Sequence, residues 1–354
     1  MIREYGGCVK KLASLGKIHP DFFRRFIYPK LGRRDSTVAV KPQSGVDFGV
    51  IDLGDKVLVL STDPFFIARE LGMEKAAWFA VHIIASDVAV SGIAPRYLSI
   101  DLNLPPEMNE DELVRMWDTV HQECAKLKIA VVTGHTARYA GCAYPMVGGA
   151  TMFGIDRREK LIVPRARVGD AVIVSKGPAI ETTGLMAAYF PHCLEERYGR
   201  GFVRKAQDVY YQMSTVKDAL VAAAAGGVTA LHDATEGGLL GGLWEIASHS
   251  KVGMRIDLDR VLVQETVRKT CDCFGIDPFI AISEGTLLAT ARPSRADGVV
   301  RALKNAGIEA SIVGEVAPLK EGVRVYQGTR GKLLRYPPAD PFWSTFEKYL
   351  SHNQ

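Results

Sequence analysis

The sequence predicts a mixed α/β protein of two domains, and three observations carry this prediction. The chain has 354 residues, which exceeds the usual size of a single hydrophobic core. Its composition is 47% hydrophobic with 34 glycines, as in globular α/β proteins. Apolar runs typical of strands alternate with runs at helical spacing along both halves of the chain. We therefore expect one domain of sheet and helices in each half.

The N-terminal half contains the elements of the first domain. Strands are expected where apolar residues run together, and helices where they recur every three or four positions. The expected strands include 56–61 and 144–153, and the expected helices are 74–91 and 110–127. The charged stretch Asp156–Lys160, followed by Pro164, breaks this pattern. An N-terminal segment, 1–35, would thus precede a domain spanning 36–160.

The C-terminal half repeats the alternation of strands and helices. The expected strands include 171–175 and 228–231, and the expected helices are 181–190, 204–225 and 238–249. Strands and helices continue to alternate to about residue 327. The second domain, an α/β sandwich, is therefore predicted over 161–330. The last residues, 331–354, are rich in proline and aromatic side chains, and we expect an extended tail that packs onto the body.

Composition and charge exclude several classes of function. The net charge is only +4, and no basic run interleaved with aromatic residues is present, so nucleic acid is not an expected partner. No apolar stretch approaches the roughly 20 residues that span a bilayer, and no signal-peptide core is found. A soluble, cytoplasmic protein is therefore expected. The six cysteines lack zinc-site spacing, which favours reduced thiols.

The most informative stretch of the sequence is a glycine-rich turn between a predicted strand and a predicted helix. Gly237 and Gly238 open the helix, where free backbone N–H groups and the helix dipole attract anions. Asp233 and Glu236 would repel a phosphate unless a divalent cation lay between them. Thr235 and Asp233 could instead cap the helix. From these residues alone, a metal-bridged phosphate and a helix cap have similar weight.

Three aspartates of the first domain form a second constellation. Asp47, Asp63 and Asp87 each lie beside apolar residues that must be buried, and each has glycine, serine or threonine nearby. Carboxylates that converge in this way are costly without a cation. Oxygen ligands favour Mg²⁺, which accompanies the phosphates of ATP. A turn or cap role is the ordinary interpretation of any single aspartate, but the series favours a magnesium site.

The order of the motifs resembles the aminoimidazole ribonucleotide (AIR) synthetase superfamily. The matching motifs are Gly-x-Asp, Ser-Thr-Asp, Ser-Asp-x-Ala-x-Ser-Gly-x-x-Pro, Thr-Gly-His-Thr, Val-Gly-Asp-x-x-Ile-Val-Ser and His-Asp-Ala-Thr-Glu-Gly-Gly. They run in order over about residues 36–317. Within the superfamily, Gly275–Pro278 and Ser283–Leu288 look most like the hydrogenase-maturation branch, which dehydrates a protein thiocarboxamide to a nitrile.

This resemblance implies a homodimer whose N-terminal sheets pair into a shared barrel, with ATP bound between the two domains. It implies that a weakly nucleophilic oxygen attacks the γ-phosphate, which requires mainly positioning and charge neutralisation. By the same resemblance, Mg²⁺ would be held by Asp47, Asp63, Asp87 and Asp233. Gly134 and Thr136 would contact the phosphates, together with the turn Thr235–Gly238.

Some positions depart from the family pattern. The maturation enzymes end in a flexible tail with a terminal cysteine, whereas this sequence ends Ser351-His-Asn-Gln354. His135 stands where many relatives have an acid, and neutral imidazole is a poor ligand for Mg²⁺. We expect His135 either to weaken one metal site or to contact phosphate or substrate. His82 replaces an amide, and a satisfied core histidine is the simpler interpretation.

Three functions remain as alternatives. The first is an ATP- and Mg²⁺-dependent enzyme that phosphorylates a carbonyl or amide oxygen of a small molecule or carrier group. The second is a maturation factor or scaffold that acts on a partner protein. The third is a selenophosphate synthetase, a thiamine-monophosphate kinase or a related synthetase. Cys8, in Gly6–Lys10, faintly resembles the reactive N-terminal segment of selenophosphate synthetases.

Overall fold

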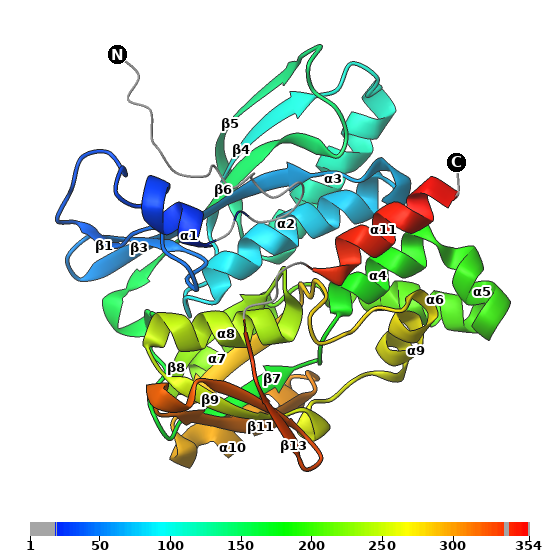
Figure 1. Ribbon diagram of the computed structural model, residues 1–354. Helices are drawn as coiled ribbons and strands as arrows, with labels where there is room; N and C mark the ends of the chain where they lie inside the picture. Colours follow the sequence, from blue (N-terminus) through cyan, green and yellow to red (C-terminus); the bar gives the residue numbers. More distant parts are fainter. Residues whose placement is uncertain (1–17, 19, 336–339, 353–354) are drawn as a thin grey trace, which may run out of the picture. The chain divides into compact units, whose positions relative to one another are not determined.

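The computed structural model describes residues 18, 20–335 and 340–352 (Figure 1). The chain divides into two compact units, Met1–Asp35 and Ser36–Gln354. The described part of the first unit contains the short helix α1 (Pro20–Phe22) and the π-helical turn η1 (Phe23–Ile27). Cys8 lies outside the described residues. Both sheets belong to the second unit.

The N-terminal sheet has six strands in the order β1-β2-β3-β6-β4-β5, of which only β4 and β5 pair in parallel. The strands are β1 (Val38–Val40), β2 (Gly49–Asp52), β3 (Lys56–Phe66), β4 (Tyr97–Leu104), β5 (Ala130–Arg138) and β6 (Met146–Arg157). The helices of this half are η2 (Arg69–Leu71), α2 (Met73–Ala89), α3 (Glu110–Lys126) and η3 (Arg158–Lys160). The predicted helices at 74–91 and 110–127 correspond to α2 and α3.

Local sequence explains how these elements pack. Along β3, every second side chain is buried, including Val57, Val59 and Phe65, so this face of the sheet lies against α2. Helix α3 begins with a capping box: the Asn109 side chain accepts the N–H of Glu112, and the Glu112 carboxylate accepts the N–H of Asn109. Helix α2 is apolar on most of its surface and lies in the core.

The C-terminal sheet has seven strands in the order β13-β12-β9-β11-β7-β10-β8. Its strands are β7 (Ala171–Ser175), β8 (Val228–Ala234), β9 (Gly253–Asp257), β10 (Thr286–Ala291), β11 (Ala310–Ala317), β12 (Val323–Gln327) and β13 (Arg330–Leu333). The α-helices are α4 (Ile180–Tyr189), α5 (Pro191–Tyr198), α6 (Arg200–Asp208), α7 (Val216–Ala225), α8 (Gly238–Ser250), α9 (Glu265–Phe274), α10 (Pro293–Asn305) and α11 (Pro341–His352). Single 3₁₀ turns lie at η4 (Val209–Gln212), η5 (Leu258–Arg260) and η6 (Leu319–Glu321).

Three hydrophobic clusters hold these elements together. The first joins the N-terminal sheet and α2 to α7, α10 and one face of the C-terminal sheet. The second fills the bundle of α4, α5, α6, α9 and α11, and the third lies between α8 and the other face of the C-terminal sheet. Because the first cluster contains residues of both sheets, the two predicted domains share one core. The predicted boundaries at 36–160 and 161–330 stay a prediction.

The structure corrects two expectations about local structure. The helix expected over 204–225 is interrupted, since α6 ends at Asp208 and α7 begins at Val216. Tyr210 in the interruption is buried, and its hydroxyl donates to the backbone oxygen of Lys75 at 3.0 Å, so tertiary packing turns the chain here.

The expected extended tail is also wrong, because 341–352 forms the helix α11, which runs beside α4 in Figure 1. Phe342, Phe346 and Tyr349 recur at helical spacing and join one hydrophobic cluster, in which Phe346 and Tyr349 pack on Phe190. Phe342 and Phe346 also stack on each other, with ring centroids 5.3 Å apart.

We expect Phe342→Ala to lower the free energy of unfolding by about 3–5 kcal/mol, because Phe342 is only 1% exposed and its removal leaves a cavity under α11. Leu350→Ala, in the same helix but 40% exposed, is the control and should change it by about 0.5 kcal/mol or less. Urea unfolding followed by circular dichroism measures both. Equal effects of the two substitutions would show that α11 does not pack as described.

Candidate functional site

Four aspartates from both halves of the chain come together between the two sheets. Asp63 lies in β3, Asp87 in α2 and Asp233 in β8, and Asp47 precedes β2. Asp87 is 8% exposed, and its pKa is raised well above the ordinary value by burial and by the charges of Asp63, Asp233 and Asp47. The carboxylates that the sequence predicted to converge are therefore neighbours. We call Asp47, Asp63, Asp87 and Asp233 the carboxylate cluster.

A serine of β3 links two members of the cluster. The hydroxyl of Ser61 lies 2.8 Å from Oδ2 of Asp87 and 2.9 Å from the backbone oxygen of Asp47. Ser61 and Asp63 are two residues apart on one strand, so both side chains face α2. The alternation of β3 thus positions a carboxylate and a hydroxyl donor on the same face of the sheet.

A buried histidine lies between two carboxylates at the edge of the cluster. His232 contacts Oδ2 of Asp47 through Nδ1 at 2.6 Å and Oε2 of Glu245 through Nε2 at 2.9 Å. Burial alone would lower the pKa of His232, but the two carboxylates outweigh it and raise this pKa well above the ordinary value. Through these two contacts, His232 ties the segment around Asp47 to β8 and α8.

The sequence patterns alone predicted no role for His232 or Glu245. His232 directly precedes Asp233 in the glycine-turn motif, and Glu245 follows in the helix, so both stood in the stretch already singled out. The pairing of His232 with Asp47, far away in the sequence, left no local pattern.

The donor set of the cluster fits a hard divalent cation. Ligand atoms of Asp47, His232 and Asp233 lie within 4.8 Å of one another. Both ring nitrogens of His232 are already engaged by Asp47 and Glu245, so the carboxylates are the available ligands. Asp87 and Asp233 are buried, and Asp47 and Asp63 are partly buried. Carboxylate-coordinated Mg²⁺ would offset their negative charge.

The glycine turn before α8 has its first N–H groups occupied within the chain. The N–H of Gly237 donates to Oδ2 of Asp340 at 2.8 Å, and the N–H of Gly238 donates to the backbone oxygen of Thr235 at 3.0 Å. Burial raises the pKa of Asp340 to about 6. Phosphate binding at Thr235, Glu236, Gly237 and Gly238 stays a prediction, and at Gly237 the phosphate would have to displace the carboxylate of Asp340.

The structure does not bring the predicted phosphate residues of β5 to the cluster. Gly134, His135 and Thr136 lie in an edge strand that is exposed along most of its length. His135 contacts the hydroxyl of Tyr139 at 3.1 Å. The strands β6 and β4 separate β5 from Asp63, so the predicted roles of these three residues are not supported within a single chain.

His82 of α2 is a satisfied core histidine, as the sequence suggested. Its Nδ1 lies 2.8 Å from the hydroxyl of Ser214, and its Nε2 lies 3.1 Å from Oε2 of Glu123. Burial lowers the pKa of His82. The ring of His82 packs on Trp78, with ring centroids 4.3 Å apart.

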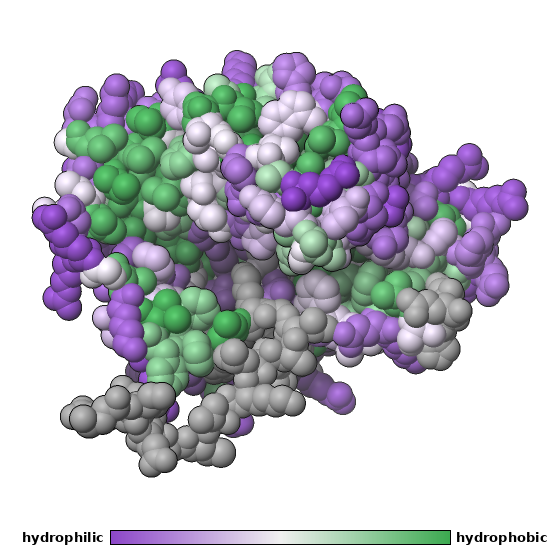
Figure 2. Space-filling model, turned by 90° about the horizontal axis from the view of Figure 1, so that it is seen from above, coloured by the Kyte–Doolittle hydropathy of each residue, from purple (hydrophilic) through white to green (hydrophobic). Residues whose placement is uncertain are grey.

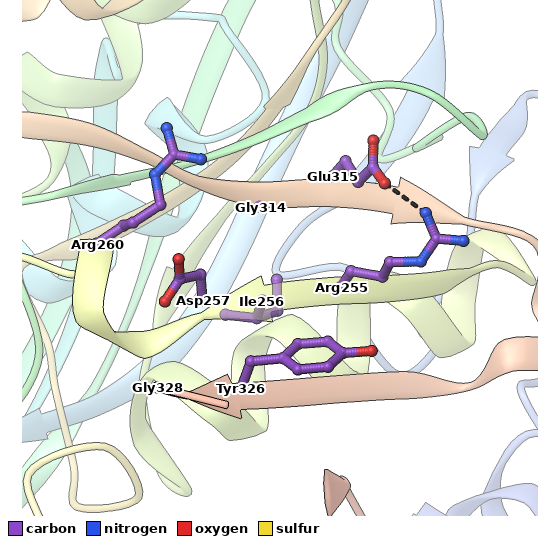
Figure 3. A pocket seen from close by; sticks show the side chains of 8 residues that line it. All are labelled: Arg255, Ile256, Asp257, Arg260, Gly314, Glu315, Tyr326 and Gly328. Atoms are coloured by element: carbon purple, nitrogen blue, oxygen red, sulfur yellow. Dashed lines mark hydrogen bonds and ion pairs between the residues drawn. The ribbon is translucent and has the colours of Figure 1, made fainter. Parts of the chain in front are cut away.

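A hollow of about 470 Å³ lies on the outer face of β9, β11 and β12, apart from the carboxylate cluster (Figure 3). Arg255 and Tyr326 line it, but the guanidinium of Arg255 is paired with Glu315 and Glu321. No member of the cluster contributes to this hollow, so we assign it no part in the chemistry of the site.

Both halves of the chain match family models. Residues 45–155 match the AIR synthase related protein N-terminal domain, and residues 167–327 match the corresponding C-terminal domain. The chain belongs to the AIR synthase related protein family. The fold and the resemblance expected from the motifs are thereby confirmed.

Relatives within this family include hydrogenase maturation proteins. A putative hydrogenase expression/formation protein of Methanocaldococcus jannaschii is 24% identical over 92% of this chain and 96% of its own length. The carbamoyl dehydratase HypE of Rhizobium leguminosarum is 28% identical over 77% of each chain. The solved structure of Escherichia coli HypE has a TM-score of 0.69 at 26% identity and covers 90% of this chain and 96% of that one.

Other solved structures show the same fold at lower identity. A HypE in complex with ATP has a TM-score of 0.67 at 24% identity, with 91% of this chain and 93% of that one covered. AaThiL complexed with AMPPCP and TMP has a TM-score of 0.66 at 20% identity, with 83% and 90% covered. A chain of a HypE–HypF complex has a TM-score of 0.66 at 18% identity, with 81% and 93% covered. Among the described residues, no helix has the length and apolarity needed to cross a membrane.

We expect Asp87→Asn to stabilise the metal-free protein at neutral pH. Because the pKa of Asp87 is raised in the folded state, that state binds a proton more tightly than the unfolded chain does. Stability should therefore fall as pH rises from about 4 through the raised pKa, and Asp87→Asn should reduce this slope. At neutral pH, Asp87→Asn should therefore unfold at a higher urea concentration than the wild-type protein.

Urea unfolding in EDTA at pH 5 to 8 measures this effect. Added Mg²⁺ should stabilise the wild-type protein more than Asp87→Asn, since a ligand that binds only the folded state raises its stability. Asp118→Asn, on the exposed surface of α3, is the control and should retain the wild-type slope. A slope that Asp87→Asn leaves unchanged would contradict the repulsion inferred for the cluster.

Proposed function

We propose that this protein is an ATP- and Mg²⁺-dependent enzyme that phosphorylates a carbonyl or amide oxygen. The observation that supports this proposal is the convergence of Asp63 and Asp87 with Asp233, from opposite halves of the chain, in a buried cluster. A purely structural role would not explain the accumulation of like charges, since each uncompensated carboxylate destabilises the fold.

The carboxylate cluster would hold Mg²⁺ through Asp47, Asp63, Asp87 and Asp233. The bound ion would neutralise phosphate charge and orient the triphosphate. Ser61 fixes Oδ2 of Asp87 by a hydrogen bond, and His232 fixes Oδ2 of Asp47, so these two carboxylates are already oriented before the ion binds.

The relatives support an amide oxygen as the acceptor. Two of the comparisons concern a carbamoyl dehydratase and a HypE that binds ATP. In this reaction the amide oxygen attacks the γ-phosphorus, and the bond from that phosphorus to the leaving ADP oxygen breaks. The two N–H protons then leave to bases, the carbon–oxygen bond breaks, and phosphate departs. One of the two protons ends on the phosphate, so the products are a nitrile, ADP, inorganic phosphate and one released proton.

The acceptor group could be carried by a protein. The similarity to a putative hydrogenase expression/formation protein over 92% of this chain favours this second candidate, and a related fold occurs in a HypE–HypF complex. The chemistry at the cluster would be the same, with the carboxamide delivered by a maturation partner. A small-molecule kinase, as the shared fold with AaThiL also allows, is the remaining alternative.

We also propose that the chain forms a homodimer through β5, the edge strand of the N-terminal sheet. Val131 and Val132 of the edge strand β5 are 41% and 55% exposed, and Met146 of β6 is 52% exposed. Figure 2 shows hydrophobic side chains gathered in patches over the face it presents. An exposed apolar edge strand is normally covered or paired. A second copy would pair with β5 and bury these side chains.

The reaction can be tested by incubating the protein with ATP, Mg²⁺ and primary carboxamides or carbamoylated peptides. Phosphorus NMR should show ADP and inorganic phosphate, and mass spectrometry should show the loss of one water from the acceptor. Asp63→Asn and Asp87→Asn should each lower turnover by about a hundredfold or more, because transition-state charge loses its neutralisation. Asp118→Asn should have wild-type turnover. A stable phosphorylated product without dehydration would favour the kinase alternative.

Substitution in β5 tests the homodimer. Val132→Lys should shift the protein from dimer to monomer in analytical ultracentrifugation, since a buried ammonium opposes pairing. Val114→Lys is a matched control, because Val114 is also 55% exposed but lies in the helix α3 and not in the edge strand β5. A wild-type monomer, or a dimer unaffected by Val132→Lys, would exclude pairing through β5.

A further inference from the structure

The turn after β7 holds a lysine in an unfavourable backbone conformation. Lys176 has a φ of 57°, in the left-handed region, and Gly177 follows with a φ of 90°. Glycine adopts this region freely, whereas a residue with a long side chain is disfavoured there. Such strain persists only where surrounding contacts fix the residue, and it gathers at ligand sites and clamps. The contacts of Lys176 should therefore show which part of the structure requires this backbone conformation.

The ammonium of Lys176 is buried and fully engaged. Nζ donates to the backbone oxygens of Gln212 at 2.9 Å and Ser214 at 2.8 Å. It also lies 3.1 Å from Oδ1 of Asp218, and the Lys176 and Asp218 side chains are 11% and 3% exposed. A buried ion pair of this kind contributes more to a defined geometry than to stability. Lys176 thereby fixes the loop Gln212–Thr215.

One arm of this network leads to α2. The hydroxyl of Ser214 contacts Nδ1 of His82 at 2.8 Å, and the N–H of Thr215 donates to the hydroxyl of Ser86 at 3.0 Å. Ser86 is the residue directly before Asp87. The loop that Lys176 holds is therefore hydrogen-bonded to the turn of α2 that carries a member of the carboxylate cluster.

The other arm leads to the C-terminal sheet. Ser175, next to Lys176, donates its hydroxyl to Oδ1 of Asp218 at 2.6 Å and accepts the N–H of Leu287 at 3.2 Å. Leu287 in β10 is the direct neighbour of Asp233 in β8. The same buried network therefore reaches the strand position beside the second-sheet member of the cluster.

We infer that Lys176 is a positioning residue that fixes the spacing between Asp87 and Asp233. The two aspartates come from opposite halves of the chain, and metal ligands must be held within about 0.5 Å of their working positions. Lys176 acts on them through Ser86 and Ser175, without contact to the reacting groups. This inference rests on the proposed function, since it assigns Lys176 to the metal site on which that function depends.

Mn²⁺ binding followed by electron paramagnetic resonance tests this role, with unfolding in urea as the parallel readout. Lys176→Gln should weaken Mn²⁺ binding by about 10- to 100-fold, as other residues that orient metal ligands do. Lys176→Gly removes the ammonium but relieves the backbone strain, so its stability should exceed that of Lys176→Gln while its Mn²⁺ affinity stays low. Lys176→Arg keeps the charge and should restore part of the affinity.

Lys217→Gln is the matched control, because Lys217 lies beside Asp218 in α7 but is exposed and donates to the backbone oxygen of Ala306 at 2.6 Å. It should bind Mn²⁺ like the wild type. If Lys176→Gln does not fold, the double variant Lys176→Gly with Asp218→Asn takes its place in these measurements. This double variant removes both the ammonium and the carboxylate, so it leaves no unpaired buried charge.

The outcomes separate the inference from the proposed function. Folded Lys176 variants that bind Mn²⁺ within about twofold of the wild type would overturn the inference and leave the metal site intact. Absence of Mn²⁺ binding by the wild-type protein would overturn both. Asp63→Asn provides the reference for loss of a ligand itself, and it should weaken binding at least as much as Lys176→Gln.

Discussion

Electrostatic repulsion among buried aspartates is the constraint on which the candidate site depends. Asp87 is buried next to Asp63 from the N-terminal sheet and Asp233 from the C-terminal sheet. His232 lies between Asp47 and Glu245, so a proton on its ring would offset only part of the negative charge. Because the acids come from both sheets, a cation bound among them would also link the two halves of the chain. Metal binding and the alignment of the two halves of the chain therefore depend on each other.

The sequence was sufficient to find the acids but not the groups that orient them. Asp63 and Asp87 each adjoin apolar runs, which predicted both at the ends of core elements; Asp87 lies near the end of α2, whereas Asp63 lies within β3, which continues to Phe66. The partnership of Asp47 with His232 joins residues that are 185 positions apart, and no periodicity reports such a pair. Lys176 lies in a short turn whose left-handed backbone is invisible in the sequence. Long-range hydrogen bonds and backbone strain could thus be recognised only in the structure.

The same distinction explains the two errors in the predicted fold. Apolar spacing over 204–225 is consistent with one helix, yet the hydroxyl of Tyr210 bonds to Lys75 and the chain turns. In the tail, prolines suggested an extended chain, while Phe342 and Phe346 pack on the helical bundle and stabilise α11. Oδ2 of Asp340 then accepts a hydrogen bond from the N–H of Gly237, 103 residues away in the sequence. In each of these segments, contacts with residues distant in the sequence determine the local structure.

The position of β5 connects the predicted phosphate contacts to the oligomeric state. Asp63 pairs with Ala150, which pairs with Ile100, which pairs with Gly134. Three strand spacings of about 4.8 Å therefore separate Asp63 from Gly134, or about 14 Å along the sheet. His135, one residue further, faces the opposite side of the sheet from Asp63. A phosphate held beside Asp63 is out of hydrogen-bonding reach of β5 in the same chain. Contacts from Gly134 and His135 to such a phosphate are therefore expected only from a second copy whose arrangement brings its β5 next to the carboxylate cluster, and they stay predictions.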